Sequence, residues 1–565
     1  MKISVRARIV ATLIGVAALT GLAPSVQAQP QSATAPRTSA RPKLIVALSV
    51  DQYSTNLFDE WRPRYTAGLA RMAQGVAYNG FQTHGGTETC PGHSTLLTGK
   101  HPNKTGIVAN NYRDPVSGNR IYCLDDPGVV IANDPPVSPA ISPVGPARLM
   151  ASTLGDWMKA ADPRSRVVAV SGKDRSAINM AGHRADGTFW MIGGVGLVTY
   201  MPPGGDAAQA LAPVADFNRR IAPVWTTRPT WTYAHADCRA LAADWTVGNR
   251  PFPSKLPPEN WGQADDPTVI AANVMASPMA DELTADAAVE LIDRFRLGRG
   301  PATDLLAVSF SATDYVGHRY GTRGPEMCEQ QRRLDANLGR LFAKLDSLKV
   351  PYLVVLSADH GGSDFTERLR AQGYPAKRVD AAAVMDRVNK ALMAELNLPA
   401  APLSGDLEEI NLTVGPQDRP RVLAAALRIL HAQPEVAAAF SQEELLATPI
   451  RKGASPDEIS LKERFAMSVY PGRSPDIVTA LPPMYTTYLA GPGQNMSSHG
   501  SPWDYDRQVP ILFWWPGASA EWRFLPVGTI DIAPTLAAAV GLAPPTDIDG
   551  RCLQLPAASG VRCPN

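Results

Sequence analysis

The stretch Lys43-Leu-Ile-Val-Ala-Leu-Ser-Val-Asp51 is apolar at nearly every position and rich in residues that favour β-strands. Apolar and polar residues do not alternate in it, so we expect both faces of the predicted strand to be buried. Similar runs recur at residues 165–171, 304–311, 351–358 and 509–515. Strands that are buried on both faces are typical of mostly parallel sheets covered by helices.

Helical patterns separate these runs, at residues 147–159, 280–294 and 326–348. The alternation predicts an α/β fold with a central, mostly parallel sheet and helices on both of its faces. Charged and imidazole side chains follow several predicted strands, and ligands of open α/β sheets bind at that carboxyl edge. We therefore expect one shared site. The residues that follow the strands are Asp51, Lys173, Arg175, Asp314, Asp359 and His360.

Two stretches interrupt this pattern and are predicted to be insertions that cap the site. Residues 201–268 are rich in Pro, Trp and Gly, and residues 365–470 carry amphipathic helices, one of them at 420–432. The catalytic core is then expected in three parts. These parts are residues 43–200, 269–364 and 471–565, the last including a C-terminal tail.

Residues 1–28 have the pattern of a secretory signal peptide. Basic side chains at positions 2, 6 and 8 precede an apolar run at 9–22, and Val26-Gln27-Ala28 supplies a small residue before the predicted cleavage point. A membrane anchor is the alternative, but the apolar run is short for a bilayer span. A linker at residues 29–42 follows. We expect a periplasmic or secreted protein without a membrane span in its mature form.

The charge balance argues against a nucleic-acid-binding protein. The chain has 54 basic and 53 acidic residues, for a formal net charge of +1, whereas such proteins carry an excess of basic residues. Any anion must therefore be attracted by a local site.

Six cysteines in an exported chain are enough for three disulfides. Cys552 and Cys563 lie close together in the loop-rich tail and are the predicted pair. Cys90 lies inside the segment considered next, where a buried thiol and a disulfide are both open.

The segment Thr87-Glu-Thr-Cys-Pro-Gly-His-Ser-Thr-Leu-Leu-Thr-Gly99 predicts a short helix, because Pro91 suits its first turn and Gly99 suits its end. Thr89 would lie just before the helix N-terminus, where the dipole and free N–H groups favour negative charge. A hydroxyl group there is well placed to become an alkoxide nucleophile. The alternative is that Thr89 only caps the helix.

Three carboxylates and three histidines in separate motifs predict a metal site. They are Asp51, Asp314, His318, Asp359, His360 and His499. Asp314 and His318 are four residues apart and share a face if the segment is helical. Asp359 and His360 precede two glycines, which permit a sharp turn that aims both side chains inward. Singly, each pair can be an ion pair or a helix cap; together they form a mixed nitrogen and oxygen set that suits zinc.

The order of these motifs resembles the alkaline phosphatase superfamily. It looks closest to the branch shared by nucleotide pyrophosphatase/phosphodiesterases and the threonine-nucleophile alkaline phosphatases. Gly106-Ile-Val-Ala-Asn110-Asn111 and Ile530-Asp-Ile-Ala-Pro-Thr-Leu536 belong to the same pattern. The resemblance extends over residues 43–542, and the two predicted insertions are the part that it explains least.

The resemblance implies two zinc ions (Zn²⁺) per chain and a covalent phosphothreonine intermediate on Thr89. Carried over by position, the ligands of one ion are Asp314, His318 and His499. Those of the other are Asp51, Asp359, His360 and the Thr89 oxygen. Zinc would lower the pKa of the Thr89 hydroxyl for attack on phosphorus, and the second ion would stabilise the leaving oxygen and later activate water.

Three further side chains are expected to bind the phosphate group. Asn110 would donate its side-chain amide, although Asn110-Asn111 can also be a simple turn. Lys173 and Arg175 are two residues apart at a predicted extended strand end, so they would point the same way. The two cations would match the extra negative charge of a monoester, as in the threonine-type alkaline phosphatases, whereas the phosphodiesterase branch lacks such a pair. The alternative for this pair is a solvated turn that pairs its charges locally.

The sequence thus predicts an exported alkaline phosphatase, a phosphoric monoester hydrolase that acts on small-molecule phosphate esters. No nucleic acid binding is expected beyond possible nucleotide substrates. The leading alternative is a nucleotide pyrophosphatase/phosphodiesterase with the same zinc site. A sulfatase is disfavoured, because Cys90-Pro91-Gly92-His93 breaks the nucleophile segment of that branch. A zinc- or phosphate-binding protein without turnover is disfavoured, because neither the nucleophile nor any metal ligand is missing.

Overall fold

The computed structural model describes residues 41–114, 117–133, 142–259, 261–263, 265–489 and 495–564. The predicted signal peptide and most of the predicted linker lie outside the described residues. All the described helices and strands belong to the unit Thr38–Asn565.

A sheet of ten strands forms the centre of this unit, and five consecutive strands within it are parallel. From edge to edge the strands are β20 (Glu521–Gly528), β2 (Val76–Phe81), β19 (Gln508–Trp514), β12 (Tyr352–Ser357), β1 (Leu44–Val50), β11 (Asp304–Phe310), β6 (Val167–Ser171), β7 (Gly187–Ile192), β8 (Gly196–Met201) and β5 (Val130–Ala132). Strands β12, β1, β11, β6 and β7 pair in parallel, whereas β19 and β8 are antiparallel to their neighbours. The predicted α/β fold with a mostly parallel sheet is confirmed.

Strand β1 shows why the opening stretch has no polar face. Leu44 and Val46 lie in one hydrophobic core, and Ile45 and Ala47 lie in another on the opposite face of the sheet. Because side chains alternate between faces along a strand, a strand between two cores must be apolar at successive positions.

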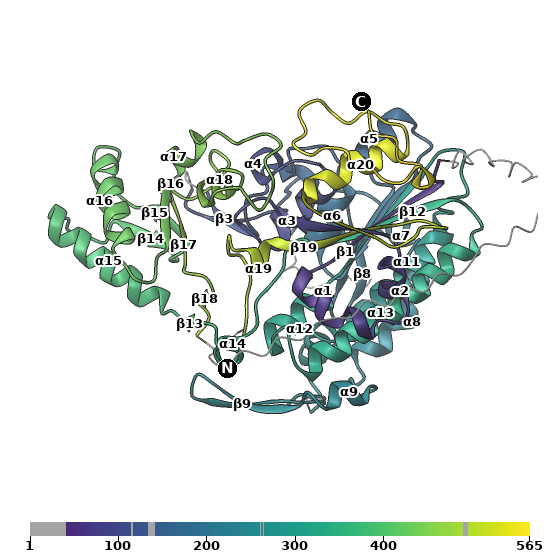
Figure 1. Ribbon diagram of the computed structural model, residues 1–565, viewed down its shortest axis with the longest axis horizontal. Coiled ribbons are helices and arrows are strands. Elements are labelled where there is room, and N and C mark those ends of the chain that lie inside the picture. Colours follow the sequence, from purple (N-terminus) through teal and green to yellow (C-terminus); the bar gives the residue numbers. More distant parts are fainter. Residues whose placement is uncertain are drawn as a thin grey trace, which may run out of the picture. The chain divides into compact units, whose positions relative to one another are not determined.

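Helices cover the two faces of the sheet (Figure 1). The first core contains apolar residues of α11 (Pro278–Arg294) and α13 (Pro325–Ser347). The second contains those of α5 (Leu154–Ala161) and α20 (Ile532–Ala539). Burial of apolar surface on both faces, at about 25 cal/mol per Å², holds the layers together. The sheet is therefore fixed from both sides, which keeps its carboxyl edge rigid.

The two segments predicted as insertions carry elements outside the central sheet. In the first lie α7 (Ala207–Leu211), α8 (Ala215–Ile221), and the hairpin of β9 (Ala243–Val247) and β10 (Arg250–Ser254). In the second lie α15 (Ala381–Leu396), α16 (Arg419–His431), and a sheet of β14 (Leu403–Gly405), β15 (Glu409–Leu412), β17 (Ile477–Ala480) and β16 (Ala438–Ser441). This second segment has a hydrophobic core of its own and is green in Figure 1. Its sheet continues beyond residue 470, so we define the cap as residues 365–481.

Three disulfides join Cys90 to Cys123, Cys238 to Cys328, and Cys552 to Cys563. The predicted pair in the tail is confirmed, and Cys90 is a disulfide partner rather than a thiol. Among the described helices, none is both long and apolar enough to cross a membrane.

Candidate active site

Thr89 lies at the N-terminus of helix α3 (Thr89–Leu96), which Glu88 precedes as N-cap. Thr89 was predicted to lie just before the helix, but it is the first helical residue. It lies in the first turn, where free N–H groups favour an anion. It is 1% exposed and lines a cavity of about 150 Å³. The other predicted site residues that line this cavity are Asn110, Arg175, Asp314, His318 and His499.

The predicted metal ligands lie at the carboxyl ends of adjacent parallel strands. Asp51 directly follows β1, and Asp359 and His360 follow β12. Asp314 and His318 lie on helix α12 (Ala312–Tyr320), which follows β11. Because these strands are neighbours in the sheet, side chains far apart in sequence come together at one edge.

The six side chains form two adjoining clusters. His360 Nε2 is 3.6 Å from Asp51 Oδ1 and 3.3 Å from Asp359 Oδ2. Asp314 Oδ1 is 3.2 Å from His318 Nε2 and 3.4 Å from His499 Nε2. The rings of His360 and His499 stack with their centroids 3.6 Å apart, and donor atoms of Asp314, His360 and His499 lie within 4.8 Å of one another.

Each histidine is oriented by a backbone carbonyl. The Nδ1 atoms lie 2.9 Å from Ser497 O for His318, 2.9 Å from Gly361 O for His360, and 2.8 Å from Thr87 O for His499. A carbonyl oxygen only accepts, so each Nδ1 carries the ring proton and each Nε2 has a free lone pair. All three lone pairs face carboxylates, which is the arrangement of histidines that bind metals.

Buried atoms in these clusters lack hydrogen-bond partners among the described residues. They are Asp51 Oδ1, Asp314 Oδ1, Asp359 Oδ2 and His360 Nε2. An unsatisfied buried polar group costs about 1–3 kcal/mol, and more when it is charged. All four atoms are acceptors that lie close together, so one bound cation can satisfy several of them at once. The donor set therefore fits divalent metal ions.

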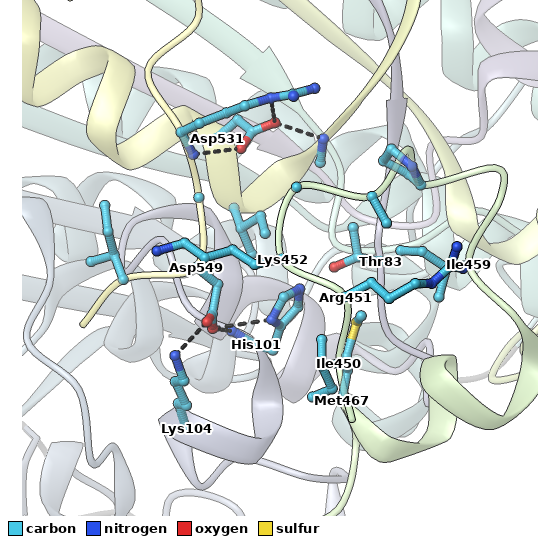
Figure 2. Close-up of a pocket in the computed structure, with 18 of the residues that line it drawn as sticks. Thr83, His101, Lys104, Ile450, Arg451, Lys452, Ile459, Met467, Asp531 and Asp549 are labelled. Atoms are coloured by element: carbon cyan, nitrogen blue, oxygen red, sulfur yellow. Dashed lines mark hydrogen bonds and ion pairs between the residues drawn. The ribbon is translucent and has the colours of Figure 1, made fainter. Parts of the chain in front are cut away.

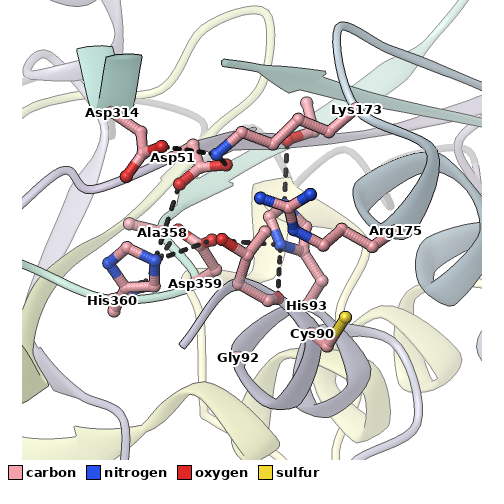
Figure 3. A network of polar contacts seen from close by, with 12 residues as sticks. Asp51, Cys90, Gly92, His93, Lys173, Arg175, Asp314, Ala358, Asp359 and His360 are labelled. Carbon is pink, nitrogen blue, oxygen red and sulfur yellow. Dashed lines mark hydrogen bonds and ion pairs between the residues drawn. The ribbon is translucent and has the colours of Figure 1, made fainter. Parts of the chain in front are cut away.

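Lys173 connects the two clusters, as Figure 3 shows. Its Nζ donates to Asp51 Oδ2 at 2.7 Å and to Asp314 Oδ2 at 2.6 Å. Burial opposes the charge on this amine, but the carboxylates of Asp314 and Asp51 outweigh burial and raise the pKa of Lys173. Lys173 is therefore a permanent cation at the centre of the site.

Lys173 and Arg175 were predicted to lie on an extended strand end, and this prediction was wrong. Strand β6 ends at Ser171, Lys173 is the N-cap of helix α6 (Asp174–Ala181), and Arg175 is the second residue of that helix. The chain passes directly from a parallel strand into its crossover helix, so the helix N-terminus stands at the same edge of the sheet. Arg175 still reaches the cavity that Thr89 lines, and its Nε has no hydrogen-bond partner among the described residues.

Asn110 is held in place by hydrogen bonds of both its side chain and its backbone. Its Oδ1 accepts a hydrogen bond from Cys90 N at 2.9 Å, and its backbone N–H donates to Glu88 at 2.5 Å. The backbone N–H of Cys123 donates to Asn110 O at 3.0 Å, so the Cys90–Cys123 disulfide ties this segment to α3. With Oδ1 occupied, the amide Nδ2 is the end of the side chain that remains to bind an anion.

His93 has a place in the site that the sequence did not reveal. This buried ring lies with Nδ1 3.1 Å from Asp359 Oδ2 and 2.9 Å from Thr89 O, and with Nε2 2.8 Å from Ser309. It therefore holds the helix of Thr89 against a predicted metal ligand. Its spacing of four residues from Thr89 is the signal from which its contact with the Thr89 carbonyl can be predicted.

The two glycines after His360 serve close packing rather than a turn. Neither has a positive φ, so a left-handed backbone conformation is not what requires glycine here. A Cβ on Gly361 would lie 2.4 Å from Tyr505 O, and one on Gly362 would lie 2.7 Å from Gln52 Cγ. Glycine is needed here because neighbouring chain segments leave no room for a side chain.

Gly92→Ala is expected to lower kcat/KM for any substrate of this site by about 10²-fold, the typical cost of a shift near 1 Å in a catalytic group. A Cβ on Gly92 would lie 2.0 Å from Asp359 O, so α3 and Thr89 must move away from the metal ligand. Steady-state kinetics and thermal unfolding of the variant measure the effect. Gly415→Ala in the cap, where no atom lies within 4 Å, is the control, and equal activity of both variants would contradict this packing role.

Another cavity, of about 400 Å³, lies between residues 450–467 of the cap and the C-terminal segment (Figure 2). In it Asp549 pairs with Lys104 and, at 3.0 Å, with His101. Of the described residues that line it, none is a predicted site residue.

Comparison with known proteins agrees with this fold and site. Residues 45–502 match the family model described as type I phosphodiesterase / nucleotide pyrophosphatase. The chain is 39% identical to alkaline phosphatase PhoD of Zymomonas mobilis subsp. mobilis, covering 92% of this chain and 89% of the relative. It is also 39% identical to alkaline phosphatase PhoK of Sphingomonas sp., covering 92% of both chains. The crystal structure of wild-type alkaline phosphatase PafA superposes with a TM-score of 0.77 at 25% identity, covering 91% of this chain and 98% of PafA.

These matches extend over the α/β core and the predicted metal site alike. The chain belongs to the type I phosphodiesterase / nucleotide pyrophosphatase family, within the alkaline phosphatase superfamily. The predicted resemblance is confirmed, and so is the predicted enzyme class, a phosphoric monoester hydrolase.

Proposed function

We propose that the chain is an exported alkaline phosphatase that hydrolyses phosphate monoesters through a covalent phosphothreonine on Thr89. The observation that carries this proposal is the cavity itself. In it the hydroxyl-bearing N-terminus of α3 faces a carboxylate–histidine cluster and the cation of Arg175. Lys173 adds a second cation through its contacts with both clusters.

Two zinc ions are proposed as cofactors, one in each cluster. Asp314, His318 and His499 would hold one ion, and Asp51, Asp359 and His360 the other, with Thr89 beside it. When bound, such ions lower the pKa of a coordinated hydroxyl group or water and stabilise negative oxygen. The oriented histidines and the unsatisfied acceptor atoms described above support this assignment.

The chain's own groups then carry the reaction. The Thr89 oxygen forms a bond to phosphorus as the ester P–O bond breaks and the alcohol leaves. Water displaces Thr89 in a second in-line step, so two inversions give overall retention at phosphorus. Arg175 and Asn110 Nδ2 donate to phosphate oxygens, and the N-terminus of α3 favours the charge that develops there.

Export is supported by cysteine use as well as by the N-terminal pattern. All six cysteines form disulfides, and disulfides persist in oxidising compartments. We therefore propose a periplasmic or secreted location.

A nucleotide pyrophosphatase/phosphodiesterase is the second candidate, and the name of the matching family model favours it. A diester, however, presents less negative charge at the transferred group than a monoester does. The buried Lys173 and the half-buried Arg175 favour the monoester, because its more negative transferred group is attracted more strongly by nearby cations.

Removal of metal by a chelator is expected to abolish hydrolysis of an aryl phosphate monoester, and two equivalents of zinc per chain are expected to restore it. Mass spectrometric metal analysis and kcat/KM for the aryl monoester and its matching diester test the proposal together. We expect a strong monoester preference. Full activity in metal-free protein would refute the zinc assignment, and a diester preference would favour the second candidate.

A further inference from the structure

A second cavity, of about 390 Å³, adjoins the proposed catalytic cavity between the core and the cap. Asn110, Tyr488 and His499 line both cavities, so the two share a wall beside Thr89. The alcohol part of an ester held at Thr89 must extend away from the phosphate-binding side chains. This second cavity has the size and position to receive it.

Carboxylates dominate the lining of this second cavity, which we call the acidic cavity. They are Glu88, Asp406, Glu408, Glu409 and Asp506. Among the described lining residues Arg120 is the one lysine or arginine, and none of the five carboxylates forms an ion pair with a described basic residue. Burial, followed by the negative charges of Asp406, Glu88 and Asp506, raises the pKa of Glu408 to about 7. Burial also raises the pKa of Glu409, so the negative charge of the cavity increases as the pH rises.

Asp506 gives an independent indication of a missing partner. It is 1% exposed and lines the cavity, and its Oδ1 has no hydrogen-bond partner among the described residues. Its Oδ2 accepts hydrogen bonds from Ser501 N at 2.9 Å and from Ser501 Oγ at 2.6 Å. A buried carboxylate oxygen without a donor favours a cationic or hydrogen-donating ligand.

The spacing of the carboxylates suits an organic cation better than a bare metal ion. Among the described residues, no group of three or more potential metal donors within 4.8 Å of one another includes any of these five carboxylates. Three tyrosines, Tyr485, Tyr488 and Tyr505, line the same cavity. Aromatic faces together with carboxylates at a distance recognise ammonium groups, and quaternary ammonium groups in particular.

We propose that the acidic cavity binds the alcohol part of substrates whose alcohol carries a positive charge. The preferred substrates are phosphate monoesters of amino alcohols and quaternary ammonium alcohols. An alcohol part that carries a further phosphate is disfavoured, because its charge meets the carboxylates. This inference rests on the proposed phosphatase function for the adjoining cavity.

The test compares two esters of equal shape with the zinc-loaded full chain. Choline phosphate carries a quaternary nitrogen, and 3,3-dimethylbutyl phosphate carries a neutral carbon in its place. We expect kcat/KM to favour choline phosphate by about tenfold at low ionic strength, since aromatic faces and carboxylates attract an ammonium group but not a neutral carbon. The preference is expected to shrink as salt screens the carboxylates.

Variants identify the cavity as the source of the preference. Glu408→Gln combined with Glu409→Gln is expected to bring the two kcat/KM values to near equality while the neutral ester is little affected. The matched control combines Glu435→Gln with Glu443→Gln, which removes the same charge from elsewhere on the cap and should keep the preference. Equal kcat/KM for both esters in the unmodified protein, or an unchanged preference in the first double variant, overturns the inference.

Calorimetric titration of choline tests the cavity without turnover. We expect choline to bind the unmodified chain and not the Glu408→Gln, Glu409→Gln variant. Hydrolysis of 4-nitrophenyl phosphate separates the two proposals. If this aryl ester is hydrolysed, but choline does not bind and kcat/KM does not favour choline phosphate, only the cavity inference fails. If the aryl ester is not hydrolysed, the proposed function fails, and choline binding alone decides on the cavity.

Discussion

Thr89→Ala is expected to lower kcat for an aryl phosphate monoester by about 10³-fold or more, because it removes the group that accepts the phosphoryl transfer. Thr89 is buried at the start of α3 and lines the proposed catalytic cavity, where the neighbouring side chains are fixed by the sheet edge. The substitution removes only a hydroxyl and a methyl group, so the fold should be preserved, and Asp51, Asp359 and His360 remain to hold the metal ion. Steady-state and single-turnover kinetics with metal analysis measure the effect.

Two further experiments, a Thr89→Ser variant and acid trapping of the intermediate, make this test specific to covalent catalysis. Thr89→Ser keeps a hydroxyl at the same position and is expected to retain most of the activity. Acid quenching during turnover of a radiolabelled monoester should trap label on the unmodified chain and on Thr89→Ser, but not on Thr89→Ala. If Thr89→Ala stays within about tenfold of the unmodified kcat, Thr89 is not the nucleophile.

Strand positions in the core were predictable because a strand that is buried on both faces is apolar at nearly every position. The run at 43–51 contains β1 (Leu44–Val50), and the run at 304–311 contains β11 (Asp304–Phe310). The run at 509–515 overlaps strand β19 (Gln508–Trp514), but the antiparallel direction of this strand was not predicted. The direction of β19 depends on how the long connection through the cap returns to the sheet, and it cannot be inferred from the local composition.

The predicted metal-ligand candidates come together because each follows a strand of one sheet edge or a loop beside it. Asp51 and Asp359 illustrate this: they are far apart in sequence but follow strands β1 and β12, which are paired in register. What was not predictable depends on packing between distant segments. The contact of His93 with Asp359 and the bridge from Cys90 to Cys123 are of this kind. The acidic cavity is another, since Glu408 and Asp506 meet only once the cap folds over the core.

The double variant Lys173→Ala, Arg175→Ala is expected to reduce kcat/KM for a monoester by about 10³-fold or more, while kcat/KM for the matching diester falls by less than about tenfold. Removal of one preorganised donor to a developing oxyanion lowers kcat by about 10²–10³-fold. The transferred group of a monoester is more negative than that of a diester, so it loses more stabilisation when the two cations are removed. Monoester selectivity should therefore collapse. The ratio of the two kcat/KM values in each variant is the measurement, and Arg184→Ala on the surface near the end of α6 is the matched control.

Arg175→Ala alone decides between substrate recognition and metal-site support. Lys173 donates to Asp51 and Asp314, so its removal also takes a hydrogen-bond donor away from two of the proposed metal ligands. Arg175 makes no hydrogen bond to either of these carboxylates, so its removal should leave metal content unchanged. A large loss of monoester preference in Arg175→Ala with full zinc content supports direct binding of the phosphate group. If Arg175→Ala keeps the preference and only variants of Lys173 lose it, together with zinc, then the cations maintain the metal site and substrate choice has another origin.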